Sequence, residues 1–219
     1  NNAVRAVVLG EDGVIAVSRV PLYVSLCTTG SPLDKEITTT LKEKSIATLE
    51  SPISGGPPGA VAGTLSVMAS GPEDAFREVE PMLGAWGKIT YAGSTPGAAQ
   101  VLKLANNPPS ATALAATAED VVMGVKGGLD PAVMLEAINA GSGRNSATQD
   151  KFPRDVLTRN FRSGAALDIL MKDTDLALAE GAALGVDLKG CNQVRNRFRA
   201  ALTAGRGKPD TTAIVWARQ

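Results

Sequence analysis

The feature that most constrains the fold of this chain is a change of pattern near residue 95. Before it, short apolar runs alternate with polar stretches of helical periodicity; the runs are "LYVSL" (22–26), "IATLE" (46–50), "TLSVMA" (64–69) and "KITYAG" (88–93). After it, Ala and Leu dominate and no strand signal of any strength appears. Alternating strands and helices predict an α/β sheet, whereas successive helical patterns predict an all-α domain. We therefore expect an α/β fold followed by an all-helical part, with the boundary near Gly93.

Capping residues, together with the Gly and Pro residues that end helices, indicate where the helices are expected. In the first part they cover 2–9, 31–44 with Ser31 as N-cap and Pro32 at the first helical position, and 72–86. In the second part they cover 96–107, 110–126, 130–140, 146–158, 165–185, 190–204 and 211–218. Pro108 and Pro109 separate the first two of these. Because proline inside a helix removes a hydrogen bond and costs about 3 kcal/mol, we expect a kink or break after Asn107.

Charge and residue usage exclude several classes of function. Lys and Arg together number 22, as do Asp and Glu, so the balance indicates neither a nucleic acid nor a membrane as a partner. Histidine is absent, which excludes Ser-His-Asp and Cys-His catalysis and the common zinc sites. Cys27 and Cys191 lie far apart without ligand-like neighbours, so we expect no disulfide framework, no metal site and a cytoplasmic protein. Any proton transfer must use Lys, Asp, Glu, Tyr or Cys.

Lys103 and Asn107 are the first candidate site residues. They lie four positions apart in "QVLKLANNPPS", so in a helix they share a face. A lysine can pass a proton to a forming alkoxide, and an amide can orient a substrate. The neighbouring residues are mostly apolar, which favours burial of this helix. The alternative is an ordinary solvated lysine near a helix end.

Three further stretches have a functional and an ordinary interpretation. Ser54-Gly55-Gly56 could approach an anion through backbone N–H groups, or could be a Gly/Pro loop between strands. Thr28 and Thr29 follow a predicted strand, where ligands gather in open α/β sheets, or they belong to a capping loop. Lys172 and Asp173 lie in an expected helix, where Lys172 could instead form a surface ion pair with Asp168.

Taken in order, these stretches resemble the β-hydroxyacid dehydrogenase family, which includes 3-hydroxyisobutyrate dehydrogenase. "SPISGGPPGAVAGTLSVMASG" resembles its substrate-binding signature, and "GAAQVLKLANN" resembles its catalytic Lys-x-x-Asn-Asn segment. "GLDPAVMLEAINAGSGRNSATQDKFP" is similar to bacterial members, and "LMKDTDLALAEGAALGV" is similar to the Lys-Asp block near the cofactor. The resemblance extends through essentially all 219 residues.

The resemblance implies an oxidoreductase that binds NAD or NADP and interconverts a small β-hydroxyacid and its aldehyde or keto form. In such an enzyme a Rossmann domain precedes an all-α domain, and the active site lies in the cleft between them. Lys103 would be the general acid/base, and Asn107 would orient the substrate. Ser54, Gly55 and Gly56 would hold the substrate carboxylate. Thr29, Lys172 and Asp173 would belong to the cofactor region, with Asp173 positioning Lys172 or serving the structure; the enzyme would be a homodimer or homotetramer through its helical domain.

Two departures from the family keep other interpretations open. The chain begins at Asn1 and contains no G-x-G-x-x-G turn, which in the family lies upstream. We therefore expect residues 1–93 to be the C-terminal portion of an incomplete Rossmann-type, doubly wound domain, and residues 94–219 to be the helical substrate and dimerisation domain. The missing turn and the prolines suggest a non-catalytic helical dimerisation or interaction remnant as one alternative. An imine-reductase-like enzyme is another, although that group usually replaces the lysine at position 103.

Overall fold

The computed structural model of the chain describes residues 1–17, 19–203, 210–212 and 214. The chain forms two compact units, Asn1–Ala105 and Asn106–Gln219. The predicted change in fold class is confirmed, because the strands lie in the first unit and the described residues of the second are mainly helical. The domain boundary at residues 93 and 94 stays a prediction.

The first unit contains alternating helices and strands. In chain order they are α1 (Asn2–Leu9), η1 (Val14–Ala16), β1 (Leu22–Ser25), α2 (Ser31–Lys42), β2 (Ala47–Glu50), β3 (Ile53–Ser54), α3 (Gly56–Ala62), β4 (Leu65–Ala69), α4 (Glu73–Gly84) and β5 (Gly87–Tyr91). The strands pair as β1–β2 and as β3–β4–β5; β1–β2 and β4–β5 are parallel, and β3–β4 is antiparallel. The two sheets meet where Glu50 and Ser70 exchange both backbone hydrogen bonds, each 2.9 Å long.

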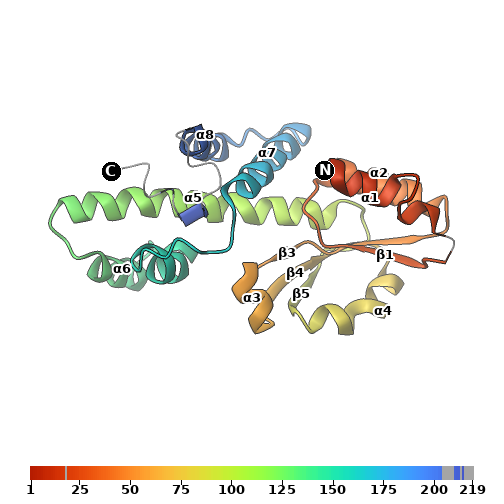
Figure 1. The fold of residues 1–219 in the computed structure, drawn as a ribbon, viewed down its shortest axis with the longest axis horizontal. Coiled ribbons are helices and arrows are strands. Elements are labelled where there is room, and N and C mark those ends of the chain that lie inside the picture. The colour runs from red at the N-terminus through yellow and green to blue at the C-terminus, as the bar shows by residue number, and fades with distance from the viewer. Residues whose placement is uncertain (18, 204–209, 213, 215–219) are drawn as a thin grey trace. The chain divides into compact units, whose positions relative to one another are not determined.

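Helices cover both faces of these strands, as expected for a doubly wound sheet. Helices α1 and α2 lie on one side and α4 on the other (Figure 1). On the α2 side, Ile37 and Leu41 form a core cluster with Val8 and Ile46. On the α4 side, a second cluster is formed by residues of β2, β4 and α4: Leu49, Leu65, Val67, Ala69, Phe76 and Leu83.

Two local expectations in this unit differ from the structure. Helix α2 begins at Ser31, so the N-cap is Gly30, whose φ of 85° suits a residue without Cβ better than a serine. The stretch 51–64, for which a Gly/Pro loop was one interpretation, instead forms the short strand β3 and the short helix α3. Pro57 and Pro58 stand at the start of α3, where missing N–H groups cost no helical hydrogen bond.

Buried polar groups from the sheet fix the start of α5 (Ala98–Lys126). The Glu50 carboxylate accepts a hydrogen bond from the Gly97 N–H, and Ser70 Oγ accepts one of 2.9 Å from the Ala99 N–H. Ser70 Oγ also donates to Glu50 Oε2 at 3.0 Å. Burial raises the pKa of Glu50, and the hydrogen bonds from Gly97 and Ser70 oppose this shift. Two N–H groups at the helix start, which have no partner within the helix, are thus satisfied by side chains of the sheet.

The expected break after Asn107 is wrong, because α5 runs without interruption from Ala98 to Lys126 through Pro108 and Pro109. The prolines leave the Leu104 and Ala105 carbonyls without their usual helical donors. Ala105 is exposed, so its carbonyl can be hydrated. Beyond the prolines, Leu114 and Val121 are buried in the core of the second unit. Burying a Leu or Val side chain contributes about 1.5–3 kcal/mol, so this packing offsets the cost of the prolines.

The second unit is built from α5 and the helices that follow it. They are α6 (Pro131–Ala140), the π-helix η2 (Ala147–Val156), α7 (Leu167–Ala183) and α8 (Lys189–Thr203). Each coincides approximately with an expected helix, and Asp130 caps α6 by accepting from the Ala132 and Val133 N–H groups. The core contains Leu114, Phe152 and Phe198. Much of the expected helix at 211–218 lies outside the described residues.

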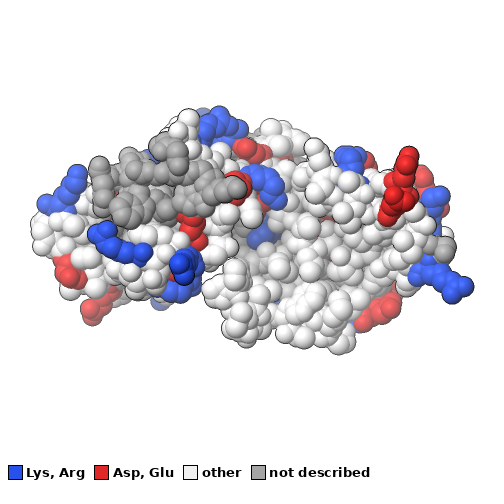
Figure 2. Space-filling model, in the orientation of Figure 1, with Lys and Arg blue, Asp and Glu red and all other residues white. Residues whose placement is uncertain are grey.

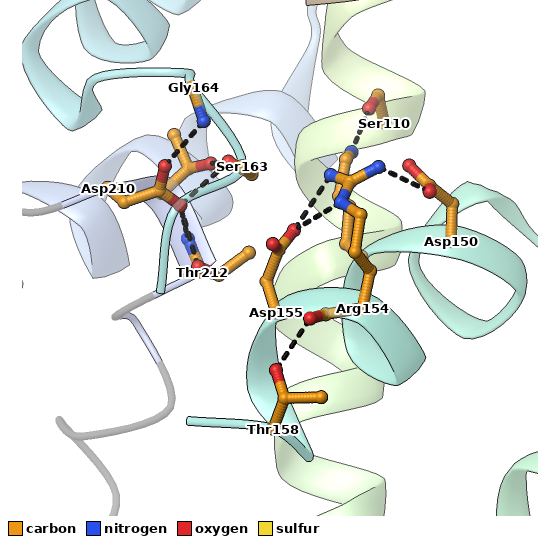
Figure 3. A network of polar contacts seen from close by, with 11 residues as sticks. Ser110, Asp150, Arg154, Asp155, Thr158, Ser163, Gly164, Asp210 and Thr212 are labelled. Carbon is orange, nitrogen blue, oxygen red and sulfur yellow. Dashed lines mark hydrogen bonds and ion pairs between the residues drawn. The ribbon is translucent and has the colours of Figure 1, made fainter. Parts of the chain in front are cut away.

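A polar network holds the segment that precedes α7 (Figure 3). The Asp210 carboxylate accepts hydrogen bonds from Ser163 Oγ at 2.7 Å, the Gly164 N–H at 2.8 Å and the Thr212 hydroxyl at 2.6 Å. Burial alone would raise the pKa of Asp210, but these hydrogen bonds outweigh it and lower the pKa. In a second part of the network, Arg154 pairs with Asp150 and Asp155. Asp210 thereby anchors the approach to α7, the helix that carries Lys172 and Asp173.

The molecular surface carries charges of both signs. Basic and acidic side chains are interspersed over the face shown in Figure 2, with uncharged surface between them.

None of the helices in the described part of the chain combines the length and the apolar character needed to cross a bilayer.

We expect Pro109→Ala to raise the free energy of unfolding by about 2 kcal/mol. The substitution restores a helical hydrogen bond and removes the clash of the proline ring, which together stabilise the folded state by about 3 kcal/mol. It also increases the conformational entropy of the unfolded chain, which costs about 1 kcal/mol of stability. Denaturant unfolding followed by circular dichroism measures the change. Pro21→Ala, at an exposed non-helical position, is the control and should lower stability by about 0.4–1 kcal/mol. Equal effects of the two substitutions would show that α5 is not strained at Pro109.

Candidate functional site

Lys103 lies in α5, in the part of the helix that belongs to the first unit. Its exposed fraction is only 7%, so the alternative of a solvated surface lysine does not describe it. Lysine is almost never buried unless polar or charged groups compensate for its loss of hydration. Asn107 lies four residues later in the same helix and therefore on the same face as Lys103.

The second unit brings together three of the predicted site residues. Asn107 Nδ2 donates a 2.7 Å hydrogen bond to Asp173 Oδ2, and Lys172 Nζ lies 3.0 Å from Asp173 Oδ1. The Asp173 side chain is 8% exposed, whereas that of Lys172 is 43% exposed. Asp173 therefore bridges an amide and an ammonium group from α5 and α7. It fixes the direction of the Asn107 amide and leaves the Lys172 side chain in contact with solvent.

The Ser54-Gly55-Gly56 turn connects β3 to α3. Gly55 has a φ of 128° and Gly56 a φ of 62°, conformations that side chains with a Cβ rarely adopt. A Cβ at Gly55 would also lie 3.0 Å from Leu65 Cδ2. Pro57 and Pro58 have no N–H groups. The backbone amide donors of this turn therefore belong to Gly55 and Gly56. Both glycines are exposed, so the turn can approach a carboxylate through its backbone.

The polar groups of Thr29 are all used in hydrogen bonds within the first unit. Its N–H donates to Gln100 Oε1 at 3.0 Å, its carbonyl accepts from Asn1 Nδ2 at 2.8 Å, and its hydroxyl donates to Asp34. Thr29 is 2% exposed. The side chain therefore serves the loop that follows β1 and does not project from it into solvent. A ligand could contact Thr29 only through the free lone pairs of its oxygen atoms, or could contact other residues of the same loop.

Two buried residues near Thr29 were missed by sequence reasoning. Gln100 and Asp34 are both 0% exposed, and both contact Thr29. Gln100 stands three residues before Lys103 in an otherwise apolar part of the segment, which was a signal available in the sequence. Asp34 gave no such signal, because an acidic residue in the first turn of a helix is ordinary.

Asp34 is held in an environment that disfavours its charge. Burial is the main cause and raises its pKa from 3.8 to about 7; the Thr29 hydroxyl opposes this shift, and the charge of Glu50 adds to it. Oδ1 of Asp34 has no hydrogen-bond partner among the residues that the structure describes. The carboxyl group is therefore balanced between its acid and its carboxylate near neutral pH.

We expect the free energy of unfolding of the protein to decrease as the pH rises from about 4 to about 7, in part because of Asp34. The folded state binds a proton there that the unfolded state has lost, so raising the pH favours unfolding. Asp34→Asn keeps an oxygen for the Thr29 hydroxyl and removes the titration, so its free energy of unfolding should change less over this range. Urea unfolding at several pH values measures the difference. With the exposed Asp12→Asn as control, identical pH dependence in all three proteins would contradict this assignment.

Comparison with known proteins identifies the family. Residues 1–93 match a family model described as the NAD binding domain of 6-phosphogluconate dehydrogenase. Residues 97–217 match one described as NAD-binding of NADP-dependent 3-hydroxyisobutyrate dehydrogenase. These two matches agree on a nicotinamide dinucleotide as the cofactor.

Individual relatives agree with the family models. A 2-(hydroxymethyl)glutarate dehydrogenase of Eubacterium barkeri is 32% identical over 97% of this chain and 71% of its own length. A 3-hydroxyisobutyrate dehydrogenase of Pseudomonas aeruginosa is 34% identical over 89% of this chain and 68% of its own. The crystal structure of a Salmonella typhimurium 3-hydroxyisobutyrate dehydrogenase superposes with a TM-score of 0.88 at 28% identity, covering 99% of this chain and 75% of that one. The chain belongs to the β-hydroxyacid dehydrogenase family of NAD(P)-dependent oxidoreductases.

Proposed function

We propose that this protein interconverts a small β-hydroxyacid and its aldehyde or keto form, with Lys103 as general acid/base. The observation that carries the proposal is the burial of Lys103, at 7% exposure, inside the segment that matches the family. A bound NAD or NADP supplies the acceptor for the hydride that leaves the hydroxyl-bearing carbon. As the hydride leaves, the neutral amine of Lys103 takes the hydroxyl proton, and in the reverse direction the ammonium group returns it.

The other site residues would bind and orient the substrate. We assign the substrate carboxylate to the Ser54-Gly55-Gly56 turn, because its two glycines are exposed and leave the backbone without side-chain interference. Asn107 would orient the substrate; the support is its hydrogen bond to Asp173, which restricts rotation of the amide. A side chain already restricted in this way loses little entropy when substrate binds.

The cofactor side is assigned to Thr29 and Lys172. The loop that contains Thr29 follows the carboxyl end of the parallel strand β1, the usual position of ligands in open α/β sheets. Lys172 keeps a solvent-accessible ammonium group that can meet an anionic cofactor, and Asp173 positions it. In this proposal residues 1–93 belong to the cofactor domain, and residues 94–219 form the substrate domain, through which a homodimer or homotetramer assembles.

Cys27 and Cys191 are free thiols, in keeping with a reducing cytoplasm.

We expect Lys103→Ala to lower kcat by about 10²–10⁴-fold, the usual contribution of a general acid/base. Lys103→Arg should be similarly slow, because its guanidinium group keeps the positive charge but stays protonated. The assay is oxidation of 3-hydroxyisobutyrate and of 2-(hydroxymethyl)glutarate with NAD⁺ and with NADP⁺. Lys126→Ala removes an exposed lysine of the same helix and should leave kcat unchanged. Wild-type rates in Lys103→Ala would refute the role of Lys103. The second substrate is larger than the first by a carboxymethyl group, so their kcat/KM ratio also reports the size and charge that the pocket accepts.

The alternative of a non-catalytic dimerisation or interaction remnant predicts no dinucleotide binding. Titration of the protein with NADH and with NADPH, followed by nicotinamide fluorescence, separates the two proposals. We expect micromolar binding of at least one cofactor, and absence of binding at millimolar concentration would favour the remnant. An imine-reductase-like activity is opposed by the presence of Lys103, and a ketimine reduction assay tests it directly.

A further inference from the structure

Gln100 is a buried side chain that makes three hydrogen bonds to one loop. Its Oε1 accepts from the Thr29 N–H at 3.0 Å and from the Gly30 N–H at 3.2 Å. Its Nε2 donates to the Cys27 carbonyl at 2.9 Å. The Gln100 amide thus binds the main chain of residues 27–30 by accepting two hydrogen bonds and donating one, much as the backbone of a neighbouring strand does. At 0% exposure, water cannot replace these partners.

The 27–30 loop lies at a sensitive position in the fold. It follows β1 and ends at Gly30, which is the N-cap of α2 and has a φ of 85°. The loop carries Thr29, whose hydroxyl is bound by the buried Asp34. A short loop at the carboxyl end of a parallel strand determines how a ligand meets the sheet.

The helix that binds the 27–30 loop through Gln100 also carries Lys103. The two residues are three positions apart in α5, so they lie on neighbouring turns of one side of the helix. Glu50 and Ser70 attach the start of this helix to the sheet by accepting hydrogen bonds from the Gly97 and Ala99 N–H groups. All of these contacts lie within the first unit.

We propose that Gln100 is a positioning residue that holds the 27–30 loop in register with Lys103, so that the bound cofactor and the general acid/base are correctly spaced. This inference rests on the proposed function and adds to it a residue that touches neither substrate nor reacting atoms. An apolar residue of similar size at position 100 leaves the helix intact but deprives two N–H groups and one carbonyl of their partners. The loop should then become mobile while Lys103 stays in place.

The first test needs no cofactor. Amide hydrogen exchange is measured by NMR for Thr29 and Gly30 in the wild type and in Gln100→Leu. We expect exchange at these two amides to accelerate by about tenfold or more, because each loses a hydrogen bond. Leu83→Ala is the control: Leu83 is 0% exposed in the α4-side core, so its truncation destabilises the same unit without touching the loop. If Gln100→Leu exchanges no faster at these amides than Leu83→Ala, the inference is refuted.

The second test measures cofactor affinity and turnover in the same variants. Gln100→Leu should weaken NADH or NADPH binding by about tenfold and lower kcat, whereas Leu83→Ala should retain wild-type values at temperatures where it is folded. Equal affinity and kcat in wild type and Gln100→Leu would overturn the positioning role. If the wild type binds neither cofactor, the proposed function fails and the positioning role fails with it. The exchange experiment would still decide whether Gln100 holds the loop.

A conservative variant separates positioning from general destabilisation. Gln100→Glu keeps the acceptor for Thr29 and Gly30, but as a carboxylate it cannot donate to the Cys27 carbonyl. Once protonated, the glutamic acid regains a donor and has nearly the shape of glutamine. We therefore expect cofactor affinity of Gln100→Glu, relative to wild type at the same pH, to recover as the pH falls. The cofactor affinity of Gln100→Leu relative to wild type should not vary with pH. A flat ratio for Gln100→Glu would count against the hydrogen-bonding role.

Discussion

The structure of the α/β unit depends on a few buried hydrogen bonds that fasten the start of α5 to the sheet. Glu50 and Ser70 supply acceptors for the Gly97 and Ala99 N–H groups, which have no partner within the helix. Gln100 continues this attachment one residue later by binding the 27–30 loop. Because unpaired buried polar groups are costly, the loss of any one of these contacts would destabilise the unit. The position of Lys103 follows from them, since it lies one turn further along the same helix.

Three carboxylates, those of Asp34, Asp173 and Asp210, combine charge with burial in different ways. Asp34 is buried next to a single hydroxyl donor, so its charge is poorly compensated and its pKa rises to about 7. Asp173 is also buried, but it is paired with Lys172 and accepts from Asn107. Asp210 accepts several hydrogen bonds, which lower its pKa despite burial. The number of donors that reach the carboxylate, rather than burial alone, separates the raised pKa of Asp34 from the lowered pKa of Asp210.

Local sequence signals predicted most of the secondary structure because those signals act within a few residues. The strands β1, β2, β4 and β5 and the helices α6, α7 and α8 lie close to where apolar periodicity and capping residues indicated. The largest error was the break expected at Pro108 and Pro109. The expectation failed because it considered the helix in isolation, whereas packing of Leu114 and Val121 beyond the prolines offsets much of their cost. The π-helical form of η2 was also not predicted from its sequence pattern.

The sequence by itself determined the division into an α/β part and a helical part, the family, and the residue types able to transfer a proton in a chain without histidine. These properties follow from periodicity, motif order and chemical identity, all of which are encoded locally. Only the tertiary structure decided that Lys103 is buried, that Asp173 joins Asn107 to Lys172, and that Thr29 is held by Gln100 and Asp34. Those facts depend on contacts between residues up to 71 positions apart in the chain, and no local pattern records which distant side chain will supply a hydrogen bond.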